Sequence, residues 1–231
     1  MKYNNLERFK NIHRDKIGIC FATGPSLNRF SFDSLPGDKD DYITTGVNDM
    51  VFHPTINVDY YFCGDKKCNK GSRITGISFM EQIKEYKKNR LKGELFCTVF
   101  VNGSEHPAHF TLEEANSVGA NVCKQTTDRG VAAIKKDIHH NDFYNHSIIF
   151  TSLQFLLYTG VKKVYLIGCD AGGGGSYLEP LKAWPDNLIE HWEEFKEFIQ
   201  TCYSDVEVIS INPYNLKGWF DRDITFERDI K

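Results

Sequence analysis

The sequence lacks the features that would place the chain in a membrane, outside the cell or on a nucleic acid. No apolar run approaches the roughly 20 residues that a membrane-spanning helix needs. Residues 1–16 are polar and lack the apolar centre of a secretory signal, so we expect the chain to stay inside the cell. There is no block of Lys and Arg, and the net charge is -3, so nothing indicates binding to duplex nucleic acid.

Cysteine provides neither a disulfide framework nor a zinc pattern. The seven cysteines are an odd number at irregular spacings. Cys20, Cys97 and Cys169 lie inside apolar runs, where cysteine acts as a small buried hydrophobe, and we expect reduced thiols. Cys63 and Cys68 have no second pair at ligand spacing, which argues against a zinc site.

Three glycine signatures of common nucleotide-binding and hydrolytic sites are also missing. The chain contains no G-x-x-x-x-G-K-[ST] loop, no G-x-G-x-x-G fingerprint and no G-x-S-x-G elbow. A nucleotide site in this protein must therefore be built in another way.

Short apolar runs that end in polar or glycine turns alternate with segments of helical spacing. The runs cover residues 16–22, 42–47, 58–63, 94–101, 163–168 and 206–211, and the helical patterns cover 77–90, 147–160 and 187–203. This alternation predicts an α/β fold of Rossmann-like type, a mostly parallel sheet with helices on both faces. We expect one domain over residues 1–231, with an irregular, lid-like insertion at about 104–146, where the sequence is polar and weakly periodic.

Ligands of open parallel sheets bind at the carboxyl ends of the strands, which directs attention to the loops that follow the predicted strands. In residues 22–27, Gly24 permits close backbone approach and Ser26 offers a hydroxyl and an amide, as in a phosphate turn; a plain Gly-Pro turn explains the same residues. Residues 172–175 are four glycines, which stay mobile unless a ligand contacts their backbone, or which simply connect two elements at the surface.

Carboxylates and histidines in these loops offer further chemistry. Asp65 and Asp170 are candidates to hold a magnesium ion with substrate phosphates, and equally candidates for turn residues or helix caps. The histidines are scattered, and His146, just before the helix predicted from Ser147, is the one that merits attention as a base.

Three segments carry a family resemblance. Residues 22–27 read A-T-G-P-S-L, residues 46–48 read G-V-N, and residues 165–170 read Y-L-I-G-C-D before a G-G-G-G-S-Y loop at 172–177. These segments resemble the G-x-G-P-S-L loop, the C-N turn and the Y-L-x-G-x-D strand with its glycine/serine/tyrosine loop in bacterial lipooligosaccharide sialyltransferases. The same layout is similar to that of the motility-associated factors that modify flagellin and of the archaeal hydroxymethylpterin pyrophosphokinases.

The resemblance implies a site for a nucleotide-sugar, in particular a cytidine-monophosphate-activated sugar. Tyr177 matches a tyrosine that assists the departing phosphate. The family's catalytic histidine lies between the tyrosine loop and the next helix; residues 178–187 contain none, and His191, within the predicted helix, is the nearest candidate. The implied catalytic residues are Tyr177, His191 and Asp170, and the implied donor-binding residues are Thr23, Gly24, Pro25, Ser26, Asn48, Asp65, Ser147, Gly168 and Ser176.

The implied activity is transfer of a sugar, sialic-acid-like as one option, from a nucleotide-sugar to a glycan acceptor, with no cofactor required. Two alternatives stay open, a magnesium-dependent diphosphotransferase and a nucleotide-binding protein without catalysis. The expected partners are the nucleotide-sugar and the glycan acceptor, and nucleic acid is not expected. The expected location is the cytoplasm, either free or peripheral at the inner face of the membrane. The sequence does not set the oligomeric state.

Overall fold

The computed structural model describes residues 5–64, 76–100, 109–126, 130–144, 146–172, 176–179 and 188–225. Over these ranges the strands form one sheet in the order β6-β5-β4-β3-β2-β1-β7-β8-β9, and every neighbouring pair is parallel. The strands are β1 (Ile17–Phe21), β2 (Tyr42–Val47), β3 (Tyr60–Cys63), β4 (Glu94–Phe100), β5 (Asn121–Thr126), β6 (Asp142–Tyr144), β7 (Lys163–Ile167), β8 (Glu207–Ile211) and β9 (Arg222–Ile224). The α-helices are α2 (Phe79–Asn89), α3 (Leu112–Ser117), α4 (Ile148–Tyr158) and α5 (Leu188–Cys202).

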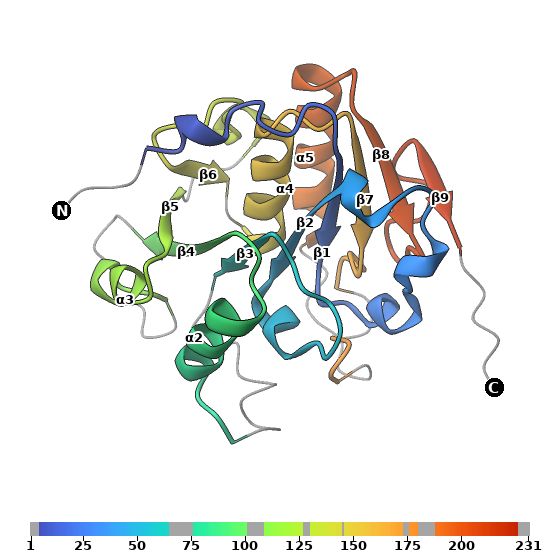
Figure 1. Ribbon diagram of the computed structural model, residues 1–231. Coiled ribbons are helices and arrows are strands. Elements are labelled where there is room, and N and C mark those ends of the chain that lie inside the picture. The colour runs from blue at the N-terminus through green and yellow to red at the C-terminus, as the bar shows by residue number, and fades with distance from the viewer. Residues whose placement is uncertain are drawn as a thin grey trace, which may run out of the picture.

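The order of the strands reverses at β1. From β1 to β6 each new strand is added on one side, and α4 then carries the chain back to β7 on the other side of β1 (Figure 1). Phe21 at the end of β1 is in register with Gly46 of β2 and with Ile167 of β7. The carboxyl ends of these three strands therefore meet at the switch point of the sheet, where α/β folds bind ligands.

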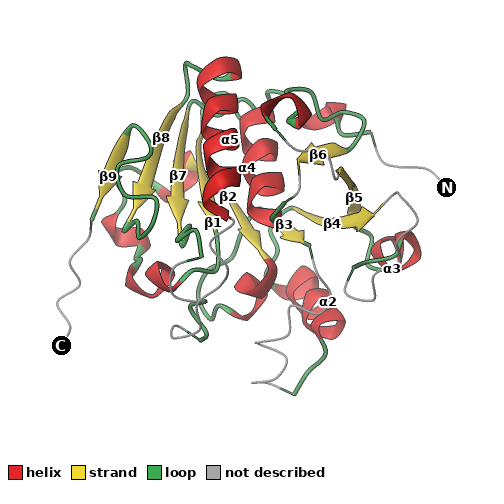
Figure 2. Cartoon of the chain, turned by 180° about the vertical axis from the view of Figure 1, so that it is seen from behind, coloured by secondary structure: helices red, strands yellow, loops and turns green. Residues whose placement is uncertain are grey.

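Helices cover both faces, which confirms the predicted Rossmann-like α/β fold. Figure 2 shows α4 and α5 side by side over one face. On the other face, α2 contributes Phe79, Ile83 and Tyr86 to the core, and α3 contributes Ala115. All residues of α4 are buried, because it packs on the centre of the sheet against β1, β2, β3 and β6. Neighbouring residues of β1 point to opposite faces: Cys20 joins the core under α4 and α5, and Ile19 joins the core on the other side.

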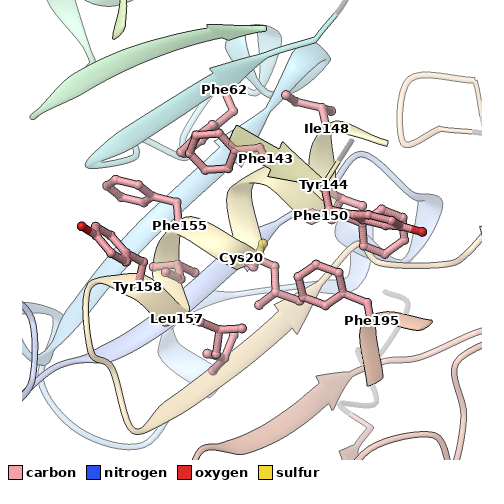
Figure 3. Packing of buried hydrophobic residues seen from close by; sticks show 14 of the residues in the cluster. Cys20, Phe62, Phe143, Tyr144, Ile148, Phe150, Phe155, Leu157, Tyr158 and Phe195 are labelled. Carbon is pink, nitrogen blue, oxygen red and sulfur yellow. The ribbon is translucent and has the colours of Figure 1, made fainter. Parts of the chain in front are cut away.

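The core under α4 and α5 is rich in aromatic rings (Figure 3). Phe155 of α4 lies 4.8 Å, between ring centroids, from both Tyr60 and Phe96, and 5.1 Å from Phe9. Phe150 of the same helix stacks on Phe195 of α5 at 5.2 Å. These contacts bind the two helices to each other and to the sheet.

The termini of α4 agree with the sequence expectation. Ser147 is the N-cap residue, although its side chain makes no capping hydrogen bond. Gly160 follows the helix with φ of 91°, the left-handed conformation that glycine adopts most readily after a helix.

Residues 104–146 were expected to be irregular, and this expectation is wrong where a helix and two strands lie, while residues 130–141 are turns and a short 3-10 helix. The helix and strands are α3, β5 and β6, and the two strands extend the sheet beyond β4. The apolar signal was weak because β5 is largely polar outside Val122 and Cys123, and β6 is only 3 residues long. The short strand β9 at the opposite edge was missed for the same reason.

Among the described helices, none combines the length and the apolar character needed to cross a membrane.

Replacing Phe155 with alanine should remove the ring at the centre of this aromatic core. Because Phe155 is fully buried, we expect the free energy of unfolding to fall by about 3–5 kcal/mol, measured by urea denaturation. Ile12→Ala is the control: Ile12 is 48% exposed, and its loss should change stability by no more than about 0.5 kcal/mol. Equal losses in the two variants would contradict this description of the core.

Candidate active site

The loops that follow β1 and β7 are joined by a set of hydrogen bonds that we call the clasp, made by Gly24, Ser26, Gly168 and Asp170. The Gly24 N–H donates to the Gly168 carbonyl at 2.8 Å, and the Ser26 N–H donates to Asp170 Oδ2 at 2.8 Å. The clasp continues the ladder between the two strands, since the Ala22 N–H also donates to the Ile167 carbonyl. The two sequence segments T-G-P-S-L and Y-L-I-G-C-D thus hold each other in place.

Both glycines of the clasp are required by the close approach of the loops. A Cβ on Gly24 would lie 2.3 Å from Asp170 Oδ2 and 2.4 Å from the Gly168 carbonyl oxygen. Gly168 has φ of +70°, and a Cβ there would lie 2.4 Å from the Ala22 carbonyl oxygen. Backbone meets backbone at this point, so no larger residue fits without separating the strand ends.

Asp170 is a buried carboxylate whose main partner is a backbone amide. Burial raises the pKa of Asp170, while the Ser26 N–H, the Ser26 hydroxyl and the charge of Arg29 favour the ionised form. The side chain is 4% exposed. Its position fixes the turn at Ser26, and the catalytic role predicted for it from the sequence stays a prediction.

Tyr177 connects three loops. Its N–H donates to the Thr23 carbonyl at 2.8 Å, and its own carbonyl accepts from Asn28 Nδ2 at 3.0 Å. Its hydroxyl donates to the Asp49 carbonyl at 2.7 Å, after β2. Burial raises the pKa of Tyr177, so the hydroxyl keeps its proton for this bond.

Asn48 joins the ends of β2 and β3. It has φ of 43°, a left-handed conformation that asparagine tolerates better than most residues. Its Oδ1 accepts from the Gly64 N–H at 2.9 Å, and its carbonyl accepts from the Tyr61 hydroxyl. Asp65, the next predicted donor-binding residue along the chain, lies outside the described residues.

A second polar group lies where α4 and α5 begin. Because α4 connects parallel strands, it starts at the carboxyl edge of the sheet, and α5 starts at the same edge after β7. His191, in α5, stacks on His146 with ring centroids 4.0 Å apart. Its Nδ1 lies 2.9 Å from the Tyr144 hydroxyl, and the same hydroxyl donates a hydrogen bond to Glu194.

The structure brings most of the predicted site residues to one edge of the sheet. That set comprises Thr23, Gly24, Pro25, Ser26, Asn48, Ser147, Gly168, Asp170, Ser176, Tyr177 and His191. Tyr144 and Glu194 were not predicted from the sequence. Tyr144 fell in the segment expected to be irregular, and the only available signal for Glu194 was its spacing of three residues from His191, which places both on one side of a helix.

Over the described residues, no group of three or more His, Cys, Asp and Glu side chains is arranged to hold a metal ion. The predicted magnesium pair of Asp65 and Asp170 involves a residue outside those ranges, so it stays a prediction.

No protein-family model matches the chain, and no curated protein matches it. Among solved structures, the MAf glycosyltransferase from Magnetospirillum magneticum AMB-1 gives a TM-score of 0.54 at 10% identity, over 98% of this chain and 35% of that chain. The monofunctional alpha-2,3-sialyltransferase Cst-I from Campylobacter jejuni gives 0.46 at 18% identity, over 85% and 75% of the two chains. The sialyltransferase CstII from Campylobacter jejuni, in complex with cytidine-5'-monophosphate, gives 0.43 at 17% identity, over 86% and 80%. The similarity to the first of these structures is one of fold, the Rossmann-like α/β sheet.

Gly24→Ala should break the clasp. The new methyl group collides with the Gly168 backbone, so the loops must separate, and we expect a loss of about 1–3 kcal/mol in the free energy of unfolding. Gly18→Ala in β1 is the matched control, because its Cβ would meet only side-chain methyl groups, of Val161 and Leu156, at 3.2–3.3 Å. A loss in Gly24→Ala no larger than that in Gly18→Ala would contradict the backbone collision.

Asp170→Asn should reveal the cost of the buried charge through its pH dependence. In the unfolded chain the carboxyl titrates near a pKa of about 3.9. Because burial raises the folded-state pKa, the stability that Asp170 contributes is complete below the unfolded pKa and is lost as the pH rises through the folded pKa. The variant cannot ionise, so its stability relative to the wild type should increase from about pH 4 upward.

Urea denaturation at steps of pH measures this difference. Asp205→Asn is the control of opposite sign, because a hydrogen bond from Lys162 lowers the pKa of the exposed Asp205. The stability of Asp205→Asn relative to the wild type should therefore not increase with pH. A pH-independent difference for Asp170→Asn would contradict the prediction.

Proposed function

We propose that this protein is a glycosyltransferase that moves a sugar from a nucleotide-sugar donor to a hydroxyl group of a glycan acceptor. The observation that carries the proposal is the clasp at the switch point of the sheet, together with a buried, hydrogen-bonded histidine at the same edge. Ligands of open parallel sheets bind at this edge, and transfer needs a group that accepts a proton.

The clasp supports a donor site because it joins the very segments that resemble the sialyltransferase signatures. Residues 22–27 and 165–170 are far apart in the sequence and are hydrogen-bonded to each other in the clasp. The proposal assigns the donor to Thr23, Gly24, Pro25 and Ser26 on one side, and Gly168 with Ser176 on the other. Asn48, tied to the same edge, extends the site toward β3.

His191 is the proposed general base. In the reaction, the proton of the acceptor hydroxyl passes to the imidazole, and the acceptor oxygen forms a bond to the anomeric carbon of the sugar. The bond from that carbon to the phosphate oxygen breaks, and the nucleotide leaves with the electron pair. Tyr177 is the proposed group that assists the departure of the nucleotide. To do so, its hydroxyl must stop donating a hydrogen bond to the Asp49 carbonyl and donate one to the phosphate.

The finer assignment is a cytidine-monophosphate-activated, sialic-acid-like sugar, which rests on the sequence resemblance. The shared fold with a MAf glycosyltransferase is consistent with sugar transfer and does not select the donor. No observation over the described residues favours diphosphate transfer, whose proposed magnesium ligands include Asp65.

A thermal-shift panel of nucleotides tests the proposal. Cytidine monophosphate should raise the melting temperature with or without magnesium, because a ligand at 100 times its Kd adds about 2.7 kcal/mol to the stability of the folded state. A shift with ATP and magnesium alone would replace sugar transfer by diphosphate transfer. No shift with any nucleotide would remove the donor site from this edge.

His191→Asn separates binding from chemistry. The variant should keep the nucleotide shift and lose about 10²–10⁴-fold in transfer from an activated sugar, which is the usual contribution of a general base. Asn48→Ala should weaken the nucleotide shift itself. Unchanged turnover in His191→Asn would exclude His191 as the base.

A further inference from the structure

The Tyr144 hydroxyl stands between a carboxylate and an imidazole. His191 Nδ1 lies 2.9 Å from the hydroxyl oxygen, and Glu194 Oε2 makes the second hydrogen bond to the same hydroxyl. Glu194 Oε2 is 3.8 Å from His191 Nδ1, too far for a direct hydrogen bond. The Tyr144 hydroxyl therefore links the Glu194 carboxylate to the His191 imidazole.

Glu194, Tyr144 and His191 form a row of hydrogen-bonded side chains. The number of hydrogens available in this row sets the direction of each hydrogen bond. A tyrosine hydroxyl has one hydrogen to donate, and an ionised carboxylate can only accept. The Tyr144 O–H must then donate to Glu194, and the hydroxyl oxygen must accept from His191 Nδ1. A neutral His191 in this row carries its hydrogen on Nδ1, and the lone pair that can take up a proton is on Nε2.

We propose that Tyr144 and Glu194 are positioning residues that lock His191 in the Nδ1–H form and so make Nε2 its basic nitrogen. The proposal rests on the proposed function, in which His191 accepts the proton of the acceptor hydroxyl. Neither residue touches the reacting atoms. They act by orienting the imidazole and by stabilising the positive charge that it acquires.

Burial strengthens this row. Tyr144 is fully buried and His191 is 5% exposed, and the rings of Phe150 and Phe195 lie against Tyr144 at 5.7 and 6.2 Å. Hydrogen bonds in such surroundings are electrostatically stronger than in water. The residues come from the end of β6 and from α5, so the sheet and a helix hold the row from two sides.

His146 acts on the same imidazole from its other side. Its ring is stacked on His191 at 4.0 Å with an angle of 7° between the planes. Two positive charges at this distance would repel each other. Tyr144, Glu194 and His146 are titratable groups that contact His191 or lie beside it.

Long-range proton-nitrogen correlation spectra of the full chain, with ¹⁵N-labelled histidine and no ligand, test the lock directly. The nitrogen shifts distinguish Nδ1–H from Nε2–H, and His191→Asn identifies the His191 signals by their loss. The wild type should show the Nδ1–H form. Tyr144→Phe keeps the buried ring and removes the hydroxyl, so the signals should move toward the Nε2–H form.

Two charge variants should move the His191 titration midpoint in opposite directions. Glu194→Gln keeps an acceptor for the Tyr144 hydroxyl and removes the charge, so the Nδ1–H form should persist while the midpoint falls by about one pH unit. His146→Gln removes the stacked imidazole and should raise the midpoint. Glu197→Gln, at an exposed position of α5, is the matched control and should leave it unchanged.

An Nε2–H form in the wild type, or an unchanged midpoint in Glu194→Gln, would overturn the proposal. In transfer assays, the acidic limb of the kcat/KM profile should move with the midpoint in Glu194→Gln, which a purely structural role would not cause. The spectra could show the Nδ1–H form of His191 while no activated sugar is turned over. In that case the proposed function fails, and the positioning of His191 by Tyr144 and Glu194 stands.

Discussion

The candidate site depends on the clasp between the ends of β1 and β7. Two backbone amides donate across it, one to the Gly168 carbonyl and one to Asp170. Because the loops approach within 2.4 Å of an added Cβ, glycine is needed on both sides. Tyr177 connects the loop after β2 to this point, and Asn48 connects the ends of β2 and β3, so hydrogen bonds link the loops along this edge.

The site draws on two structural layers. The strand ends provide glycines, backbone carbonyls and a buried carboxylate, which are suited to holding a ligand close to the main chain. Helix α5 provides His191 and Glu194, and the turn before α4 provides His146, side chains of the kinds that can take up or orient a proton. Tyr144, at the end of a short edge strand, links the two layers because it both ends β6 and contacts α5.

Sequence patterns predicted the central strands well, since β1, β7 and β8 are apolar on both faces and end in polar or glycine turns. Helix α4 was equally clear, because it is mostly apolar and is followed by Gly160. Strand β5 and the two edge strands, β6 and β9, were missed. A strand that is short or partly polar lacks the run of apolar residues on which such a prediction relies.

The sequence by itself determined the fold class, the order of the central elements along the chain and the segments that form the clasp. Local periodicity determines the elements, and the positions of the glycines mark the clasp segments. Only the tertiary structure decided that Asp170 meets Ser26, that the Tyr177 hydroxyl is bound to Asp49, and that Tyr144 stands between Glu194 and His191. The physical reason is that such contacts join residues distant along the chain, and their geometry follows from how strands and helices pack.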